Sequence, residues 1–219
     1  MSENRYAKLS CTAEEAIDLR SNRKAFDAKV TGYLSPEYLS DSQDSYRLLD
    51  GLENDLFNGD YELGSAKSDD GIFFQEGMST VLLTAEHATN HRRRNSKSEL
   101  ITKPRDYGTG SLALAAAAGT QSSVLISAGR QTGDANRDVK HPLKQKITEV
   151  MTIRPSLAHL SVHGMESALA MSLRDERGFS VMVGVGPNPS DATRTWIYDS
   201  LLPQGIELGL RFGVNDAHL

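Results

Sequence analysis

The chain has 219 residues, of which 38% are hydrophobic and 24% are charged, so it can bury a sizeable core and is too apolar for a disordered tail. Lys and Arg number 24 against 29 Asp and Glu, and the resulting net charge of −5 favours neither nucleic acid nor an anionic membrane as a partner. The single cysteine excludes an internal disulfide and a cysteine-based zinc finger. No apolar run of about 18 residues and no apolar N-terminal signal occur, so we expect a cytoplasmic protein.

The first 70 residues are rich in Asp, Glu, Ser and Asn, and their apolar residues recur at helical spacing. Thr12 and Glu15 have the spacing of a capping box at the start of one such helix. The polar run at 64–71 is typical of a linker. We therefore expect a helical extension over residues 1–70, followed by an α/β domain over residues 75–219.

The second part of the chain alternates between strand-like and helix-like segments. Short apolar or alternating runs predict strands at 80–85, 123–127, 157–163, 179–185 and 206–214. Helical patterns occur at 112–118, at 142–151 and after Ser190. This alternation predicts an α/β fold, a three-layer sandwich with a mixed or mostly parallel sheet.

Unusual polar side chains follow the predicted strands at the points where they end. Glu86 and His87 come directly after the first strand, and His163 ends the third. Ligands gather beyond the carboxyl ends of such strands, and imidazole and carboxylate groups suit zinc or another divalent metal. The same histidines also fit a purely structural role as packed, hydrogen-bonded residues at strand ends. The residues by themselves leave both interpretations open.

Arginines also follow the second predicted strand, at Arg130 and Arg137. The planar guanidinium pairs with carboxylates through two parallel hydrogen bonds, although a solvated loop arginine is the alternative. The run His91–Arg94 predicts a solvated basic loop, because it lacks the interleaved aromatic residues of a nucleic-acid site and occurs in an acidic protein. Neither a phosphate-binding Gly-Lys-Ser/Thr motif nor a Gly-x-Ser-x-Gly motif occurs. Surface or loop positions are predicted for His91, His141, His159 and His218.

Taken together, several segments resemble the N-formylglutamate amidohydrolase family. The resemblance covers roughly residues 78–216, in matching order and spacing, and leaves the first 70 residues uncovered. It is carried by the strand and Glu-His-Ala-Thr-Asn of 81–90, the Asp-Tyr-Gly of 106–110, the Arg…Asp-x-Asn-Arg of 130–137, the Ser-Val-His-Gly of 161–164 and the Asn-Asp of 214–216. The same landmarks are similar, more distantly, to those of zinc carboxypeptidases.

The resemblance implies a zinc hydrolase that cleaves the amide bond of a small, acidic N-acyl (formyl-like) amino acid with a free carboxylate. His87 and His163 would be metal ligands, and Asp216 or Glu86 would act as the general base. The substrate carboxylate would be held by Asn136, Arg137 and Arg130. We expect a small-molecule partner, neither nucleic acid nor membrane, and make no prediction of oligomeric state.

The third metal ligand is the point at which the chain departs from the family pattern. The carboxypeptidase-type position after His87 is Asn90, a poor zinc ligand, which leaves Glu86 and Asp106, with a slight preference for Glu86. Neighbouring residues of a regular strand point to opposite faces, so Glu86 and His87 can share a metal only if the strand ends there. From the resemblance we also expect Asp216 to stand in place of a longer Glu, without the family's Gly-rich closing segment. The alternative function is therefore a non-catalytic relative that binds a carboxylate ligand or acts in regulation.

Overall fold

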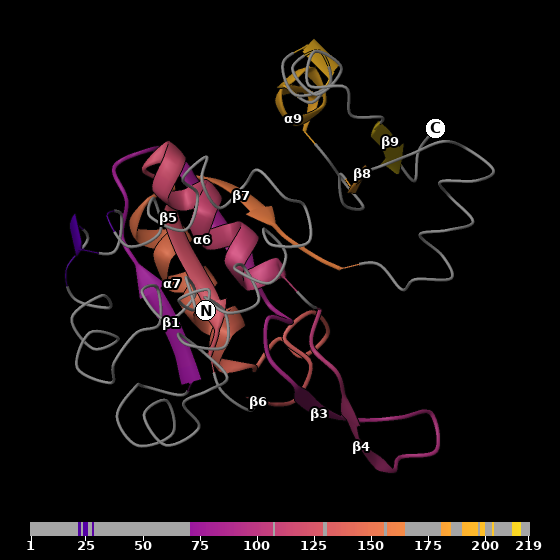
Figure 1. Ribbon diagram of the computed structural model, residues 1–219. Helices are drawn as coiled ribbons and strands as arrows, with labels where there is room; N and C mark the ends of the chain where they lie inside the picture. Colours follow the sequence, from indigo (N-terminus) through magenta and orange to yellow (C-terminus); the bar gives the residue numbers. More distant parts are fainter. Residues whose placement is uncertain are drawn as a thin grey trace, which may run out of the picture. The chain divides into compact units, whose positions relative to one another are not determined.

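The structure is a computed structural model of the chain, shown in Figure 1. It describes residues 71–106, 108–128, 131–155, 157–164, 181–184, 190–196, 198–199 and 212–215, together with residues 22, 24, 25, 28 and 203. The predicted helical extension over residues 1–70 lies almost entirely outside the described residues. The chain divides into two compact units, 1–164 and 165–219, and we treat each by itself. That residues 75–219 form one domain stays a prediction.

The first unit is built on a four-stranded mixed sheet with the strand order β1-β5-β2-β7. The strands β5, β2 and β7 run parallel, and β1 pairs with β5 in the antiparallel direction. The mixed α/β character that the sequence predicts is thereby confirmed. The strand β1 starts before the first predicted strand and was not expected. The bounds are β1 Ile72–Gln75, β2 Val81–Ala85, β5 Ser123–Ser127 and β7 Ala158–Ser161.

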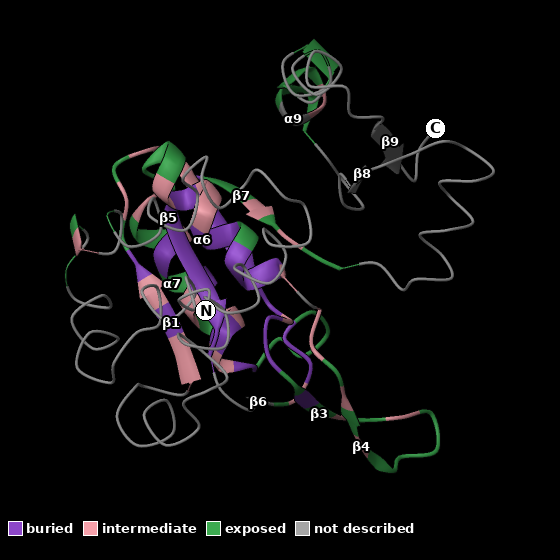
Figure 2. Cartoon of the chain, viewed as in Figure 1, coloured by how far each residue is buried: buried purple, intermediate pink, exposed green. Residues whose placement is uncertain are grey.

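Two helices, α6 (Thr109–Thr120) and α7 (Pro142–Ile153), cover the sheet. Side chains of a strand point alternately to its two faces, so the residues that each helix contacts identify the face it covers. One core cluster joins α6 to Leu83, Ala85, Val124 and Ile126, and another joins α7 to Leu82 and Leu125. The two helices therefore pack on opposite faces of the sheet. Figure 2 shows β5 buried along its length between them.

The helix starts follow from local chemistry. The residue before α6 is Gly108, whose φ of 77° is readily adopted only by a residue without a side chain. The helix α7 begins with Pro142, and the Nδ1 atom of His141 accepts a hydrogen bond from Leu143 N–H at 3.2 Å. His141, for which a surface or loop position is predicted, lies in the loop before α7, but its capping side chain is buried.

Three strands from the segment between β2 and α7 form a small second sheet with the strand order β4-β3-β6. It consists of β3 (His91–Arg94), β4 (Leu100–Lys103) and β6 (Gln131–Thr132). The prediction of a solvated basic loop at His91–Arg94 is therefore wrong: these residues form a strand whose side chains alternate between exposed and partly or fully buried positions.

The second unit contains a parallel pair of strands, β8 (Val181–Gly184) and β9 (Phe212–Asn215), and the short helix α9 (Asp191–Trp196). All three elements occur where the sequence predicts a strand or a helix, and most of the residues around them lie outside the described part of the chain. In the described part of the whole chain, no helix has both the length and the apolar character that a membrane crossing requires.

Candidate metal centre

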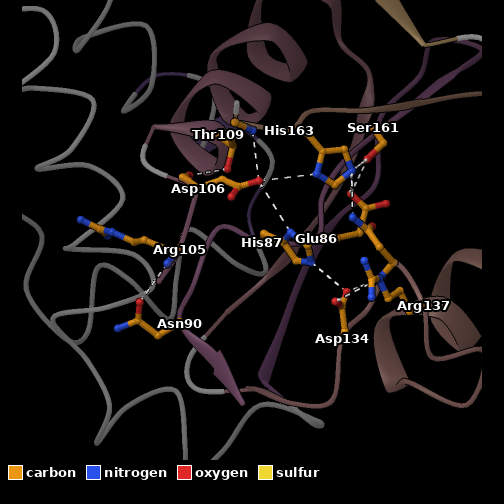
Figure 3. Close-up of polar contacts among 12 residues, drawn as sticks. Glu86, His87, Asn90, Arg105, Asp106, Thr109, Asp134, Arg137, Ser161 and His163 are labelled. Carbon is orange, nitrogen blue, oxygen red and sulfur yellow. Dashed lines mark hydrogen bonds and ion pairs between the residues drawn. The ribbon is translucent and has the colours of Figure 1, made fainter. Parts of the chain in front are cut away.

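The parallel pairing of β2 and β7 brings two distant histidines to one edge of the sheet. The register places Thr84 opposite Ser161, and Val162 N–H continues the pairing by donating to Thr84 O at 2.8 Å. His87 follows the end of β2, and His163 follows the end of β7. Their ring centroids lie 5.5 Å apart with the ring planes at 71°. Figure 3 shows both rings turned towards the Asp106 carboxylate.

Asp106 joins the two histidines from a third segment, which precedes α6. Its Oδ2 atom lies 3.6 Å from His87 Nδ1 and 3.5 Å from His163 Nδ1. Asp106 N–H donates to His87 O at 2.8 Å, and Gly164 N–H donates to Asp106 Oδ2 at 3.0 Å. A Cβ atom at position 164 would lie 2.9 Å from the Asp106 Cβ atom, so the glycine permits this close approach. His87, Asp106 and His163 together form a group that could hold a metal ion.

The Nε2 atoms of both histidines have partners on the other side of their rings. His87 Nε2 lies 3.0 Å from Asp134 Oδ1, and His163 Nε2 lies 2.9 Å from Ser161 Oγ. The Nδ1 atoms of both rings therefore face Asp106 and remain available as ligands. Ring orientation set by a hydrogen bond from the second nitrogen is typical of histidines that bind metals.

The pKa values show that the centre attracts positive charge. Burial lowers the pKa of His87, but hydrogen bonds to Asp106 and Asp134 outweigh it, so the pKa is raised. Burial by itself would raise the pKa of Asp106, yet the neighbouring imidazoles of His163 and His87 and the hydrogen bond from Gly164 N–H hold it well below its ordinary value. A cation bound at the Nδ1 atoms would take the place of the proton that His87 otherwise holds.

A second group of donors, His87, His91 and Asp134, shares His87 with the first. The rings of His87 and His91 are stacked, with centroids 4.4 Å apart and planes at 13°. The lone pair of an imidazole nitrogen lies in the ring plane, so two stacked rings cannot direct their lone pairs at one ion. Asp134 is also already paired, since Arg93 Nη1 donates to its Oδ2 atom at 2.7 Å. The first group is therefore the better metal site.

The structure corrects the prediction that His91 lies on the surface or in a loop, because His91 is the first residue of the strand β3. Its side chain is buried, and among the described residues neither ring nitrogen has a hydrogen-bond partner. Burial, and then the positive charge of His87, lowers the pKa of His91. His91 is therefore a neutral ring packed against His87.

The candidates for the third metal ligand separate clearly. In the part of the chain that the structure describes, Asp106 completes the group containing both histidines, and Glu86 belongs to neither group. Glu86 is buried and accepts hydrogen bonds from the hydroxyls of Thr84 and Ser161. The Asn90 side-chain oxygen accepts from Arg105 N–H at 2.9 Å, and Figure 3 shows Asn90 apart from the histidines.

The predicted substrate-binding residues are only partly described. Asn136 Nδ2 lies 3.4 Å from His163 Nε2, and the exposed Arg137 places its Nε atom 3.9 Å from Asp134 Oδ2. Arg130 and Asp216 lie outside the described residues. Sequence reasoning missed Arg93, although its place two residues after His91 puts both side chains on one face once 91–94 is recognised as a strand.

Three segments that are far apart in the sequence carry His87, Asp106 and His163, and they bring two imidazole nitrogens and a carboxylate oxygen together. The exposed side chains of Asn136 and Arg137 lie next to this group. Such a donor set can bind a divalent cation and leave a coordination position open. Comparison with protein-family models, with curated proteins and with solved structures finds no match to this chain.

Proposed function

We propose that the protein is a metal-dependent hydrolase that cleaves the amide bond of a small N-acyl amino acid with a free carboxylate. The observation that carries the proposal is that His87 Nδ1 and His163 Nδ1 lie 3.6 Å and 3.5 Å from the same carboxylate oxygen, Asp106 Oδ2. The resemblance to the N-formylglutamate amidohydrolase family supports the same function.

The donor set fits zinc, which binds imidazole and carboxylate ligands and keeps one position open in catalytic sites. His87, Asp106 and His163 would hold the ion. Zinc, when bound, lowers the pKa of a water molecule and polarises a carbonyl oxygen. Asp134 keeps His87 oriented, and Ser161 does the same for His163.

The substrate is proposed to bind through its carboxylate on the side of Asn136 and Arg137. Arg137 is 79% exposed, so its guanidinium can turn from Asp134 towards an incoming anion. Arg130 is a further candidate for this role, and Asp216 is the candidate general base. For the fold, we infer a three-layer sandwich with α6 and α7 as the outer layers, which their packing on opposite faces of the sheet supports.

Metal analysis combined with hydrolysis assays tests the function. We expect native protein to contain zinc and to hydrolyse N-formyl and N-acyl derivatives of acidic amino acids. His163→Ala should lose both properties, whereas Glu149→Gln, which changes an exposed carboxylate of α7 paired with Lys146, should keep both. Stoichiometric zinc in purified His163→Ala protein would contradict the ligand assignment. A metal-free native protein that binds acidic ligands without turnover would instead support the non-catalytic alternative.

A further inference from the structure

Glu86 lies at the centre of a chain of hydrogen bonds that reaches the candidate metal centre. Glu86 is 2% exposed, and its two oxygens accept from different hydroxyls: Oε1 from Thr84 Oγ1 at 3.0 Å, and Oε2 from Ser161 Oγ. Each hydroxyl also contacts a histidine. Thr84 Oγ1 lies 2.9 Å from His159 Nε2, and Ser161 Oγ lies 2.9 Å from His163 Nε2.

The fold places this whole chain on one face of the sheet. Thr84 and Glu86 are two residues apart at the end of β2, and Ser161 pairs with Thr84 in the neighbouring strand β7. His159 and His163 lie two residues before and after Ser161, so all three side chains project from the same side. Figure 3 shows Glu86 and Ser161 beside the His163 ring, on the side away from Asp106.

The direction of each hydrogen bond follows from the number of hydrogens available. Each of the two hydroxyls donates its single hydrogen to a Glu86 oxygen. Each hydroxyl oxygen must then accept from the histidine that it contacts. The histidine therefore carries its hydrogen on Nε2, and a neutral imidazole with hydrogen on Nε2 has its lone pair on Nδ1.

For His163, this lone pair is at the atom that the metal requires. Nδ1 lies 3.5 Å from Asp106 Oδ2, on the opposite side of the ring from Ser161. The Asn136 amide lies 3.4 Å from Nε2, a longer contact than that of Ser161. With the amide turned so that its oxygen faces Nε2, Asn136 also accepts from the hydrogen on that atom. Burying a carboxylate is costly unless hydrogen bonds compensate it, and the two hydroxyls supply that compensation at Glu86.

We propose that Glu86 is a positioning residue that acts through Ser161 and holds His163 in the tautomer whose Nδ1 atom binds the metal. This inference rests on the proposed function, because it assigns Glu86 a role towards the metal that the hydrolase needs. It also separates Glu86 from the ligands, since both of its oxygens are engaged by hydroxyls.

The tautomers can be measured directly in metal-free protein by long-range ¹H–¹⁵N correlation of the histidine rings. In the native chain we expect His159 and His163 to carry hydrogen on Nε2. Ser161→Ala should remove this preference at His163, and Ser161→Thr, which keeps the hydroxyl, should restore it. Thr84→Val is the matched control, because it should alter the tautomer of His159 and leave that of His163 unchanged.

Zinc affinity, measured by competition with a chelator, provides the second readout. Loss of a partner that only orients a ligand typically lowers metal affinity about 10–100-fold, which is the loss expected for Ser161→Ala. Ser161→Thr and Thr84→Val should stay close to the native affinity. Glu86→Gln offers only one acceptor oxygen, so it should reverse the tautomer of at least one of the two histidines.

The outcomes distinguish this inference from the proposed function. If the native protein binds zinc, and Ser161→Ala and Glu86→Gln bind it equally tightly, the positioning role of Glu86 is wrong while the metal centre stands. If the native protein binds no zinc, the proposed function fails, and with it the role of Glu86 towards a metal. A native His163 with hydrogen on Nδ1 would overturn the inference whatever the zinc content.

Discussion

His87 has two sides that use the same kinds of residue in different ways. On its Nδ1 side lie Asp106 and His163, on its Nε2 side lies Asp134, and His91 is stacked against its face. The ring of His163 stands at 71° to that of His87, whereas the ring of His91 is stacked on it at 13°. Only the first arrangement lets lone pairs from both rings converge on one ion. Ring orientation, more than residue type, therefore decides which side can bind a metal.

The charges around His87 also favour a cation on its Nδ1 side over its Nε2 side. Asp134 is paired with Arg93 and His87, and Arg137 lies nearby, so its negative charge is already neutralised. The Asp106 carboxylate faces two histidines and the Gly164 N–H group. A cation bound on the Nδ1 side would therefore meet a carboxylate that, among the described residues, contacts histidines and a backbone N–H group, whereas one on the Nε2 side would meet a carboxylate already paired with a guanidinium.

The comparison is tested most strongly by Asp106→Asn, which keeps the shape of the side chain but removes the charge on the Nδ1 side. We expect zinc affinity to fall by more than the roughly 100-fold that is the upper range for loss of a supporting partner, because a direct ligand is weakened. Chelator competition measures the change, with Glu149→Gln as the control. An affinity unchanged from native would place the ion elsewhere.

The matching change on the Nε2 side is Asp134→Asn. Asp134 contacts His87 Nε2 and would not contact the ion, so we expect zinc affinity to fall only about 10–100-fold. The same competition assay measures it. If Asp134→Asn abolished zinc binding while Asp106→Asn had little effect, the assignment of the two sides would have to be exchanged.

The pH dependence of folding stability tests the role of Asp134 on the Nε2 side in metal-free protein. Burial alone would raise the pKa of Asp134, but hydrogen bonds from Arg93 and His87 hold it well below its ordinary value. A lowered pKa in the folded state contributes stability that is present above the unfolded pKa of about 3.9 and is lost as the pH falls below it. At pH 7, Asp134→Asn should therefore have a free energy of unfolding roughly 1–3 kcal/mol lower than that of the native protein. Below about pH 4, the variant should lose less stability than the native protein does. Urea titrations at several pH values measure both effects, and parallel acid profiles for the two proteins would contradict the prediction.

The smallest effect is expected for His91→Phe. Phenylalanine preserves an aromatic ring against His87 and removes two buried ring nitrogens that have no partner among the described residues. Because His91 is not expected to bind the ion, zinc affinity should change by less than about threefold, which is below 1 kcal/mol. Loss of zinc from His91→Phe would show that the stacked side holds the metal.

Much of the first unit could be predicted because its signals are local. The apolar runs at 80–85 and 123–127 become the buried strands β2 and β5, and the helical patterns at 112–118 and 142–151 become α6 and α7. Residues that follow parallel strands necessarily meet at one edge of the sheet, which is why His87 and His163 could be named together.

The rest depended on contacts between distant segments. The Arg-rich stretch 91–94 has no apolar run, and it forms a strand because β4 and β6 pair with it. Asp106 lies nearly 60 residues from Gly164, yet the hydrogen bond between them brings the carboxylate to the histidines. The sequence therefore determined which chemical groups are present and where the strands that carry them end. Only the tertiary structure decided which carboxylate faces the rings and how the rings are turned, because both depend on hydrogen bonds and packing between segments that sequence patterns do not connect.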